Sequence, residues 1–429
     1  MRRPGPLHLL VAGLIWPPET FVERRLAGLA ARGFRVTVAV SFVRGADPRI
    51  PGVRVVRVPA GRLRALWCAL VLLVRRPRRV PALWRAARGS GRWRHFLPLA
   101  ALDPDVAHFE WEKWAVTHLP LAAVWGCPLT MSCHGGIQVH VHSPVPPRSL
   151  VTPLLPAAFE AVQAIHCVCE PLRDLALERG ADPAKVTIIP SAVDPDDFTP
   201  ASAQPEDAVF RVVTVAWLRW LKGMEYALEA LALVGPGVRL DIYGGDPLAS
   251  SPESSERPRL VQAIEELGLR DRVTLHGHVP PAGVLAAMRR SHVLLHPSLS
   301  EGMPTVVLEA MSCAVPVVAT DVGGVREAVR DGVEGLVVPP RDPAAMASAL
   351  HTLRADPALR MRMGAAGRSR VRSAFTLDMQ LDRFERFYRT AADTEHGTVP
   401  LGPRMRHLFA PSSAQPAAQP AGPDARSET

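Results

Sequence analysis

Lysine is scarce in this 429-residue chain, and CxxC cysteine pairs are absent. Only three of the fifty basic residues are lysines (Lys113, Lys185 and Lys222), so the composition strongly favours arginine and each lysine stands out. The six cysteines form no CxxC pair and lie mostly in apolar runs. They indicate small buried side chains in a reducing compartment rather than a disulfide framework.

An uninterrupted apolar run of transmembrane length is also lacking. The nine apolar residues from Leu66 to Val74 cannot span a bilayer, which needs about 20. The N-terminal stretch MRRPGPLHLLVAGLIWPPE places two arginines before an apolar run, as a signal peptide does. Because proline interrupts the run and no clear small-residue cleavage site follows, the stretch predicts a first core strand, and we expect a cytoplasmic protein.

The basic surplus is confined to the first half of the chain. The net charge is +9, but residues through Phe198 include 25 basic and 15 acidic residues, whereas the remainder includes 25 and 26. Ten arginines, interleaved with tryptophan, lie between Arg62 and Arg94. Two interpretations of this segment stay open: a helix in a membrane interface, attracted by anionic lipid, or a core helix with a solvated charged face. No nucleic-acid-binding module is evident, so we expect no nucleic-acid partner.

Length and the alternation of elements predict an α/β protein with two domains. The chain is too long for one compact core. Short apolar, β-branched runs alternate with helical-period segments, which is typical of a parallel sheet covered by helices. We therefore expect two doubly wound, Rossmann-like domains whose ligands bind outside the carboxyl ends of the strands, in a central cleft. The expected strands are 7–12, 36–40, 54–58, 106–109, 129–133, 165–168 and 186–189, then 212–216, 239–243, 273–275, 293–296, 316–320 and 335–338.

The expected domain boundaries follow from breaks in this pattern. Residues 1–198 form an N-terminal domain, 199–207 a proline-containing linker and 208–375 a C-terminal domain. Residues 376–393 form a helix expected to pack back on the N-terminal domain. Residues 394–429, rich in Ala, Pro, Ser and Gln, are expected to be disordered.

One motif carries the most chemical information. The residues EGMPT at 301–305 follow the strand VLLHPS and predict the start of a helix, with Ser300 as a cap and Pro304 in the first turn. Unpaired N–H groups in that turn favour anions or sugar hydroxyls. Glu309 lies eight positions after Glu301 among apolar neighbours, which predicts partial burial and a partner. The two carboxylates could bind separate diols of one elongated ligand.

The sequence around this motif, EGMPTVVLEAMSCAVPVVATDVGGVREAV, resembles the donor-site signature of glycosyltransferase family 4, whose members are retaining enzymes with the two-domain GT-B fold. The flanking GHVPPAGVLAAMRRSHVLLHPS and DGVEGLVVPPRDPAAMASAL agree with that family. ETFVERRLAGLAARGFRV and CEPLRDLALERGADPAKVTIIPSAVDPDDF extend the resemblance over most of the chain, to about Tyr388. The stretch WPPET looks like the branch that handles bacterial surface polysaccharides.

The resemblance implies roles for the residues of the motif. The family's first glutamate faces the reacting donor sugar and its second binds the ribose hydroxyls of the nucleotide; these positions are Glu301 and Glu309. Ala314 stands where the family often has glycine. The family's chemistry is metal-independent, so we expect no metal or other cofactor beside the nucleotide-sugar co-substrate. The residues expected to bring backbone groups to the sugar and diphosphate are Gly302, Met303, Pro304 and Thr305.

The family also has an arginine and a lysine, after the first strand of the donor domain, that neutralise the diphosphate. Lys222, followed by Gly223, fits the lysine. The usual arginine position holds Trp217, and we interpret Arg219 as its substitute, since a forked guanidinium suits phosphate oxygens. An ordinary surface arginine is the alternative.

His134, in SCHGG, lies at the carboxyl end of an apolar strand, where the cleft is expected. The resemblance puts this histidine near the transferred sugar. Gly13, at the end of the first strand, would let its loop approach the diphosphate closely, and Thr20 would cap the next helix. His140 and His142 lie nearby in the sequence, but no carboxylate completes a metal site.

We therefore expect a retaining hexosyltransferase that moves a sugar from a nucleoside-diphosphate sugar to a lipid-linked or glycan acceptor. If the basic helix is interfacial, we expect the enzyme to attach peripherally to the inner face of the cell membrane. Two other functions stay open. A GT-B sugar-nucleotide epimerase would bind a similar donor and transfer nothing. A catalytically silent nucleotide-sugar-binding scaffold is supported only by Trp217.

Overall fold

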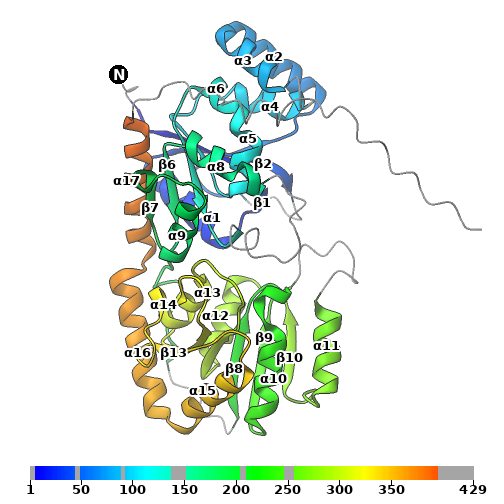
Figure 1. The fold of residues 1–429 in the computed structure, drawn as a ribbon, viewed down its shortest axis with the longest axis vertical. Coiled ribbons are helices and arrows are strands. Elements are labelled where there is room, and N and C mark those ends of the chain that lie inside the picture. Colours follow the sequence, from blue (N-terminus) through cyan, green and yellow to red (C-terminus); the bar gives the residue numbers. More distant parts are fainter. Residues whose placement is uncertain are drawn as a thin grey trace, which may run out of the picture.

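The computed structural model describes residues 5–43, 49–87, 92–136, 151–202, 209–245 and 256–394. His140, His142 and all but the first residue of the expected tail lie outside these ranges. The described residues form two parallel sheets flanked by helices, one above the other in Figure 1. This confirms the predicted α/β fold of two doubly wound domains.

The first domain contains a seven-stranded parallel sheet in the order β3-β2-β1-β4-β5-β6-β7. Strands β4 and β5 are buried at every position, because helices cover both faces of the sheet. The order reverses direction between β1 and β4, so the switch point, where such sheets bind ligands, lies there. The strands are β1 (His8–Trp16), β2 (Arg35–Val43), β3 (Val53–Arg57), β4 (Val106–Phe109), β5 (Leu129–Cys133), β6 (Ala164–Cys167) and β7 (Val186–Ile188).

Helices connect these strands. They are α1 (Thr20–Ala31), α2 (Arg62–Arg75), α3 (Val80–Ala87), α4 (Trp93–Ala100), α5 (Glu112–His118), α6 (Ala122–Trp125), α8 (Val151–Ala161) and α9 (Glu170–Glu178), with short 3-10 turns at Pro77–Arg79, Leu119–Leu121 and Pro183–Lys185. The prediction that Thr20 caps α1 is wrong: Glu19 holds the N-cap position, Thr20 is the first helical residue, and no side chain caps the helix.

The second domain contains a six-stranded parallel sheet in the order β10-β9-β8-β11-β12-β13, with its switch point between β8 and β11. Its strands are β8 (Phe210–Val215), β9 (Val238–Tyr243), β10 (Val273–Gly277), β11 (Val293–His296), β12 (Val317–Thr320) and β13 (Gly335–Val338). Its helices are α10 (Met224–Val234), α11 (Arg257–Glu266), α12 (Pro281–Arg289), α13 (Thr305–Ser312), α14 (Val325–Ala328), α15 (Pro343–Ala355) and α16 (Pro357–Ala374), with a 3-10 turn at Trp220–Lys222.

Helix α13 begins later than its motif predicts. It starts at Thr305 with Pro304 at the N-cap and no side-chain cap, so Ser300 does not cap it and Glu301 lies in the preceding loop. A proline at the N-cap loses no helical hydrogen bond, because its position needs none. At the other end, Ala314 adopts the left-handed conformation (φ 56°) that glycine would adopt with less strain.

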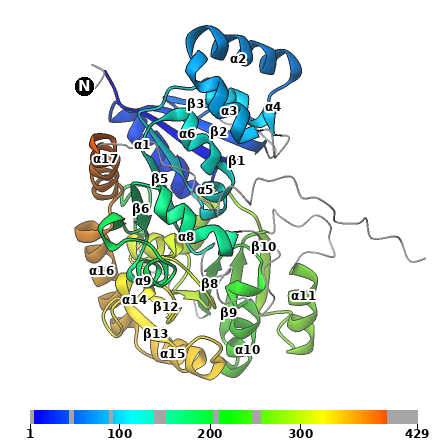
Figure 2. The same ribbon diagram turned by 45° about the horizontal axis from the view of Figure 1, so that its top comes forward.

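Helix α17 (Leu377–Asp393) leaves the second domain and returns to the first. Thr376 caps it by accepting a hydrogen bond from the Met379 nitrogen. Its apolar face, which includes Leu381, Phe384 and Tyr388, is buried in the same cluster as residues of β1, β2 and α1. Figures 1 and 2 show α16 and α17 following each other along one side of both domains. The last helix thus ties the two domains together.

Candidate active site

The site residues follow the strands that border the two switch points. Glu110 comes directly after β4 and His134 directly after β5, whereas Lys222 follows β8 and Glu301 follows β11. Because carboxyl ends of parallel strands meet at one edge of a sheet, both sets face the interdomain contact. Thus a buried carboxylate and a basic group come from each domain.

Glu301 is buried and held by three groups of its own domain. Its Oε1 accepts hydrogen bonds from Lys222 Nζ (2.6 Å) and Ser298 Oγ (2.7 Å), and His296 Nε2 lies 3.0 Å away. Burial disfavours the charged form, but the Lys222 ammonium and His296 outweigh it and hold the pKa of Glu301 well below its usual range. Glu301 is therefore a fixed anion paired with a cation.

Glu309 lies on α13, and only 14% of its side chain is exposed. Its apolar neighbours predict such burial, and its partner, which the sequence did not identify, is Arg24 on α1 of the first domain, with Nη1 3.3 Å from Oε1. Arg24 also lies near the segment in which the chain passes from the first domain to the second. Its guanidinium carbon is 5.2 Å from the ring centroid of Phe198. Burial raises the pKa of Glu309, and Arg24 lowers it in part.

The loop between these glutamates is pressed against the first domain. A Cβ atom on Gly302 would lie 2.9 Å from Val168 Cγ2 and 3.4 Å from the Gly135 nitrogen, so two glycines allow the loops after β5 and β11 to approach. Ser191 Oγ donates a hydrogen bond to the Met303 carbonyl across the same contact (2.9 Å). Gly302, Met303 and Pro304 are buried, and Thr305 is half-buried.

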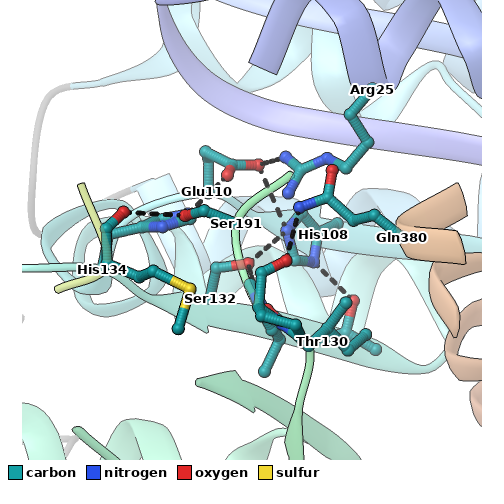
Figure 3. A network of polar contacts seen from close by, with 12 residues as sticks. Arg25, His108, Glu110, Thr130, Ser132, His134, Ser191 and Gln380 are labelled. Atoms are coloured by element: carbon teal, nitrogen blue, oxygen red, sulfur yellow. Dashed lines mark hydrogen bonds and ion pairs between the residues drawn. The ribbon is translucent and has the colours of Figure 1, made fainter. Parts of the chain in front are cut away.

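His134 is oriented by a buried carboxylate that sequence reasoning missed. Glu110 Oε1 accepts a hydrogen bond from His134 Nε2 (2.7 Å), and Glu110 Oε2 pairs with the buried guanidinium of Arg25 (Figure 3). Burial opposes the charged form of Glu110, but Arg25, His108 and His134 hold its pKa well below the usual value. The position of Glu110 at the end of β4, beside the switch point, was the signal that could have found it.

A chain of hydrogen bonds continues behind Glu110. His108 bonds with Thr130 Oγ1 through Nδ1 (2.9 Å) and with Ser132 Oγ through Nε2 (3.1 Å), and Ser132 also bonds with His166 (2.8 Å), as Figure 3 shows in part. Burial lowers the pKa of His108 and of His166, which favours the neutral form of both histidines. Satisfied buried networks of this kind rigidify the groups they support.

Glu19 is a second acidic residue that sequence reasoning missed. It lies at the N-cap of α1, where the residue as a whole is exposed but its carboxylate is desolvated by surrounding protein atoms. Desolvation raises its pKa; His134 lowers it, Glu110 raises it further, and Lys222 and Arg219 lower it. The carboxylate therefore lies within electrostatic reach of site residues from both domains.

Within the described ranges Arg219 forms no ion pair with Glu301. Its guanidinium carbon is 5.5 Å from the ring centroid of Trp217, so its charge lies beside the position where the family usually has arginine. It also lines a cavity of about 240 Å³ together with Trp220, Arg259 and Arg341, and Glu301, Glu309 and His134 do not line this cavity.

Gly13 does not end its strand, because β1 continues to Trp16 with a register shift around this residue. Its φ is 84°, and a Cβ atom there would lie 2.2 Å from the Trp114 ring. A bulge and a close packing contact therefore both require glycine, independently of any phosphate. Among the described residues, no group of three His, Cys, Asp or Glu side chains could hold a metal ion.

Fold and site together define a two-domain GT-B glycosyltransferase. Residues 18–197 match the family model described as Glycosyltransferase Family 4, and residues 197–370 the model described as Glycosyl transferases group 1. A D-inositol 3-phosphate glycosyltransferase of Xylanimonas cellulosilytica is 30% identical over 82% of this chain and 87% of the relative. One from Geodermatophilus obscurus is 31% identical over 91% of this chain and 88% of the relative. The chain belongs to glycosyltransferase family 4.

Solved structures share the fold. Sucrose-phosphate synthase from Thermosynechococcus elongatus matches with a TM-score of 0.72 at 23% identity, over 90% of this chain and 98% of that one. HepE of Anabaena in complex with UDP-glucose matches with a TM-score of 0.68 at 18% identity, over 90% of this chain and 100% of that one. At these identities the likeness concerns the fold alone.

Proposed function

We propose that this enzyme transfers a hexose from a nucleoside-diphosphate donor, with retention of anomeric configuration, to a lipid-linked or glycan acceptor. The observation that carries the proposal is the pair of the buried Glu301, in the motif of the second domain, with the half-buried Lys222. This pair lies at the contact with the domain that holds the His134–Glu110 pair. Each pair combines a fixed anion with a proton-bearing nitrogen, which suits hydrogen bonding to sugar hydroxyls and charge stabilisation.

In this proposal the second domain binds the donor. Glu309 accepts hydrogen bonds from the ribose, the backbone of Gly302 to Thr305 contacts the sugar and diphosphate, and the loop that follows Gly13 approaches the diphosphate from the first domain. Lys222 and Arg219 stabilise the diphosphate as the bond from its oxygen to the anomeric carbon breaks and the acceptor oxygen takes its place. HepE, a relative in fold, is known in complex with UDP and with UDP-glucose, which supports a nucleotide sugar as donor.

The acceptor is proposed to meet the first domain, which carries the basic surplus. A positively charged domain favours an anionic acceptor, such as a lipid carrier with phosphate groups. The curated relatives are named for D-inositol 3-phosphate, which is also a phosphorylated acceptor. A role in surface-polysaccharide synthesis at the cytoplasmic face of the membrane rests on the WPPET stretch and on this charge.

Product analysis tests the proposal. The enzyme is incubated with nucleotide sugars and, in separate arms, a lipid extract, a glycan mixture and an inositol phosphate. The products are separated by chromatography and identified by mass and by proton NMR, because an epimer has the same mass as the donor. We expect a glycosylated lipid or glycan together with free nucleoside diphosphate. An epimerised sugar nucleotide would favour the epimerase, binding without product would favour the silent scaffold, and a glycosylated inositol phosphate would replace the proposed acceptor class.

A further inference from the structure

Helix α2 is apolar on two opposite faces. Its inner face, Ala65, Cys68 and Leu72, is buried, and the helix packs against α4. Its outer face has large apolar side chains spaced three or four positions apart, which places them in one stripe. Each of them is between 52% and 84% exposed: Leu63, Leu66, Trp67, Leu70, Leu73 and Val74. A contiguous exposed apolar stripe of this kind marks an interaction surface.

The second domain does not cover this stripe. Figures 1 and 2 both place α2 at the end of the first domain that points away from the second. Trp84 of the neighbouring α3 is also 51% exposed. We call the six apolar residues of α2 and Trp84 the apolar stripe.

Charge around the apolar stripe has one sign. Residues 51–100 include twelve arginines and no aspartate or glutamate. Arg62 and Arg64 lie in the first turn of α2 and Arg75 in its last. Arg76 and Arg79 pair with Asp103, whereas Arg62, Arg64 and Arg75 form no ion pair within the described ranges. The arginine stems can lie along apolar surface while their guanidinium groups reach phosphate oxygens.

We propose that α2 docks on an anionic phospholipid membrane, lying parallel to its surface with the apolar stripe at the boundary of the acyl chains and the terminal arginines on lipid phosphates. A second copy of this chain fits poorly, because a two-fold contact through the stripe would bring arginines of both copies together. The helix has 14 residues, too few to span, and none of the described helices is long and apolar enough to cross a membrane. Only the purpose of the docking, which is to bring the enzyme to a lipid-linked acceptor, rests on the proposed function.

Vesicle sedimentation tests the docking. Wild-type protein is mixed with phosphatidylcholine vesicles, with or without phosphatidylglycerol, at low and high salt. We expect pelleting with the anionic vesicles that salt weakens. Trp67→Ser/Leu70→Ser and Arg64→Gln/Arg75→Gln should each lower the vesicle partition coefficient at least tenfold. The matched controls are Leu233→Ser/Val261→Ser and Arg270→Gln/Arg362→Gln, which change exposed residues of the second domain and should bind as the wild type does.

Depth of insertion gives an independent readout. Brominated acyl chains should quench tryptophan fluorescence of the wild type. Trp67→Phe and Trp84→Phe should each lose part of that quenching, and the double variant most of it, while still binding. Equal binding to neutral and anionic vesicles, no binding, or α2 variants that bind as the wild type does would overturn the proposal. A concentration-dependent dimer in sedimentation velocity that disappears in Trp67→Ser/Leu70→Ser would assign the stripe to a second copy instead.

Docking and transfer can fail separately. Transfer to a water-soluble acceptor without vesicles should be the same in Trp67→Ser/Leu70→Ser and the wild type, because α2 contributes no residue to the candidate active site. Vesicle binding without any transfer would contradict the proposed function and leave the docking in place. Transfer without any vesicle binding would contradict the docking and leave the proposed function in place.

Discussion

Arg24 on α1 and Glu309 on α13 form an ion pair between the two domains, with Nη1 3.3 Å from Oε1. Burial raises the pKa of Glu309, and Arg24 partly offsets this effect. A cation from the opposite domain therefore favours the ionised form of the carboxylate that we propose binds ribose. This contact links the closure of the domains to the state of the nucleotide site.

Replacing Glu309 with alanine should weaken nucleoside-diphosphate binding at least tenfold. Two hydrogen bonds to a charged acceptor contribute roughly 1.5–3 kcal/mol each, and the substitution removes both. Isothermal titration calorimetry measures the change, with Glu266→Ala on exposed α11 as the control. Unchanged affinity in a folded Glu309→Ala protein would remove the ribose assignment.

Replacing Arg24 with glutamine should weaken the same binding, and more so as pH falls. Loss of the cation raises the pKa of Glu309 further, so the variant protonates this carboxylate at a higher pH than the wild type does. The dissociation constant of the Arg24→Gln protein, divided by that of the wild type, should therefore rise toward acid pH. Arg24→Lys should restore part of the wild-type affinity. A ratio that is independent of pH would mean that Arg24 acts only through packing.

Lys222→Ala should reduce turnover by more than tenfold, a barrier change above ~1.4 kcal/mol, because the ammonium stabilises the departing diphosphate. Lys185→Ala is the control, since within the described ranges Lys185 donates only to backbone carbonyls of the first domain. Arg219→Ala should also slow turnover. Full activity of Arg219→Ala would show that Arg219 does not replace the arginine missing at Trp217.

Glu110→Gln should destabilise the protein by about 3–5 kcal/mol, because it leaves the buried Arg25 without its counter-charge. The surface substitution Glu265→Gln should cost less than about 1 kcal/mol.

Since the pKa of Glu110 is lowered on folding, the stabilisation that its carboxylate provides is present above the ordinary pKa near 4.5 and is lost as pH falls. Below pH 4.5 the free energy of unfolding should thus fall less steeply in Glu110→Gln than in the wild type, as measured by urea denaturation. Parallel pH profiles would contradict this role.

The sequence predicts the local features of this molecule well. Apolar β-branched runs and the helical period locate the strands, because each pattern is decided by a few neighbouring residues. The motif from Glu301 to Glu309 is likewise contiguous, so the sequence alone predicts it as a unit. The predicted start of its helix was wrong by a few residues, because Ser300 and Pro304 are competing signals for the N-terminus.

Partners between distant segments could not be predicted. Arg24 and Glu309 are 285 positions apart, and Glu110 acquires its role only when α1, β4 and β5 pack together. Helix α2 left two interpretations open because both of its faces are apolar, and only packing decides which one is buried. Pairwise contacts of this kind depend on the assembled fold rather than on any local pattern.

The anomeric configuration of the product tests the central claim most directly. The enzyme is supplied with a nucleotide sugar that stabilises it in a thermal-shift screen and with the acceptor that product analysis identifies. Proton NMR follows the anomeric signal during the reaction. We expect a glycoside with the configuration of the donor, formed together with one nucleoside diphosphate, and no such product from Lys222→Ala on the same time scale. An inverted glycoside, an epimerised sugar nucleotide or a donor that stays intact would contradict the account.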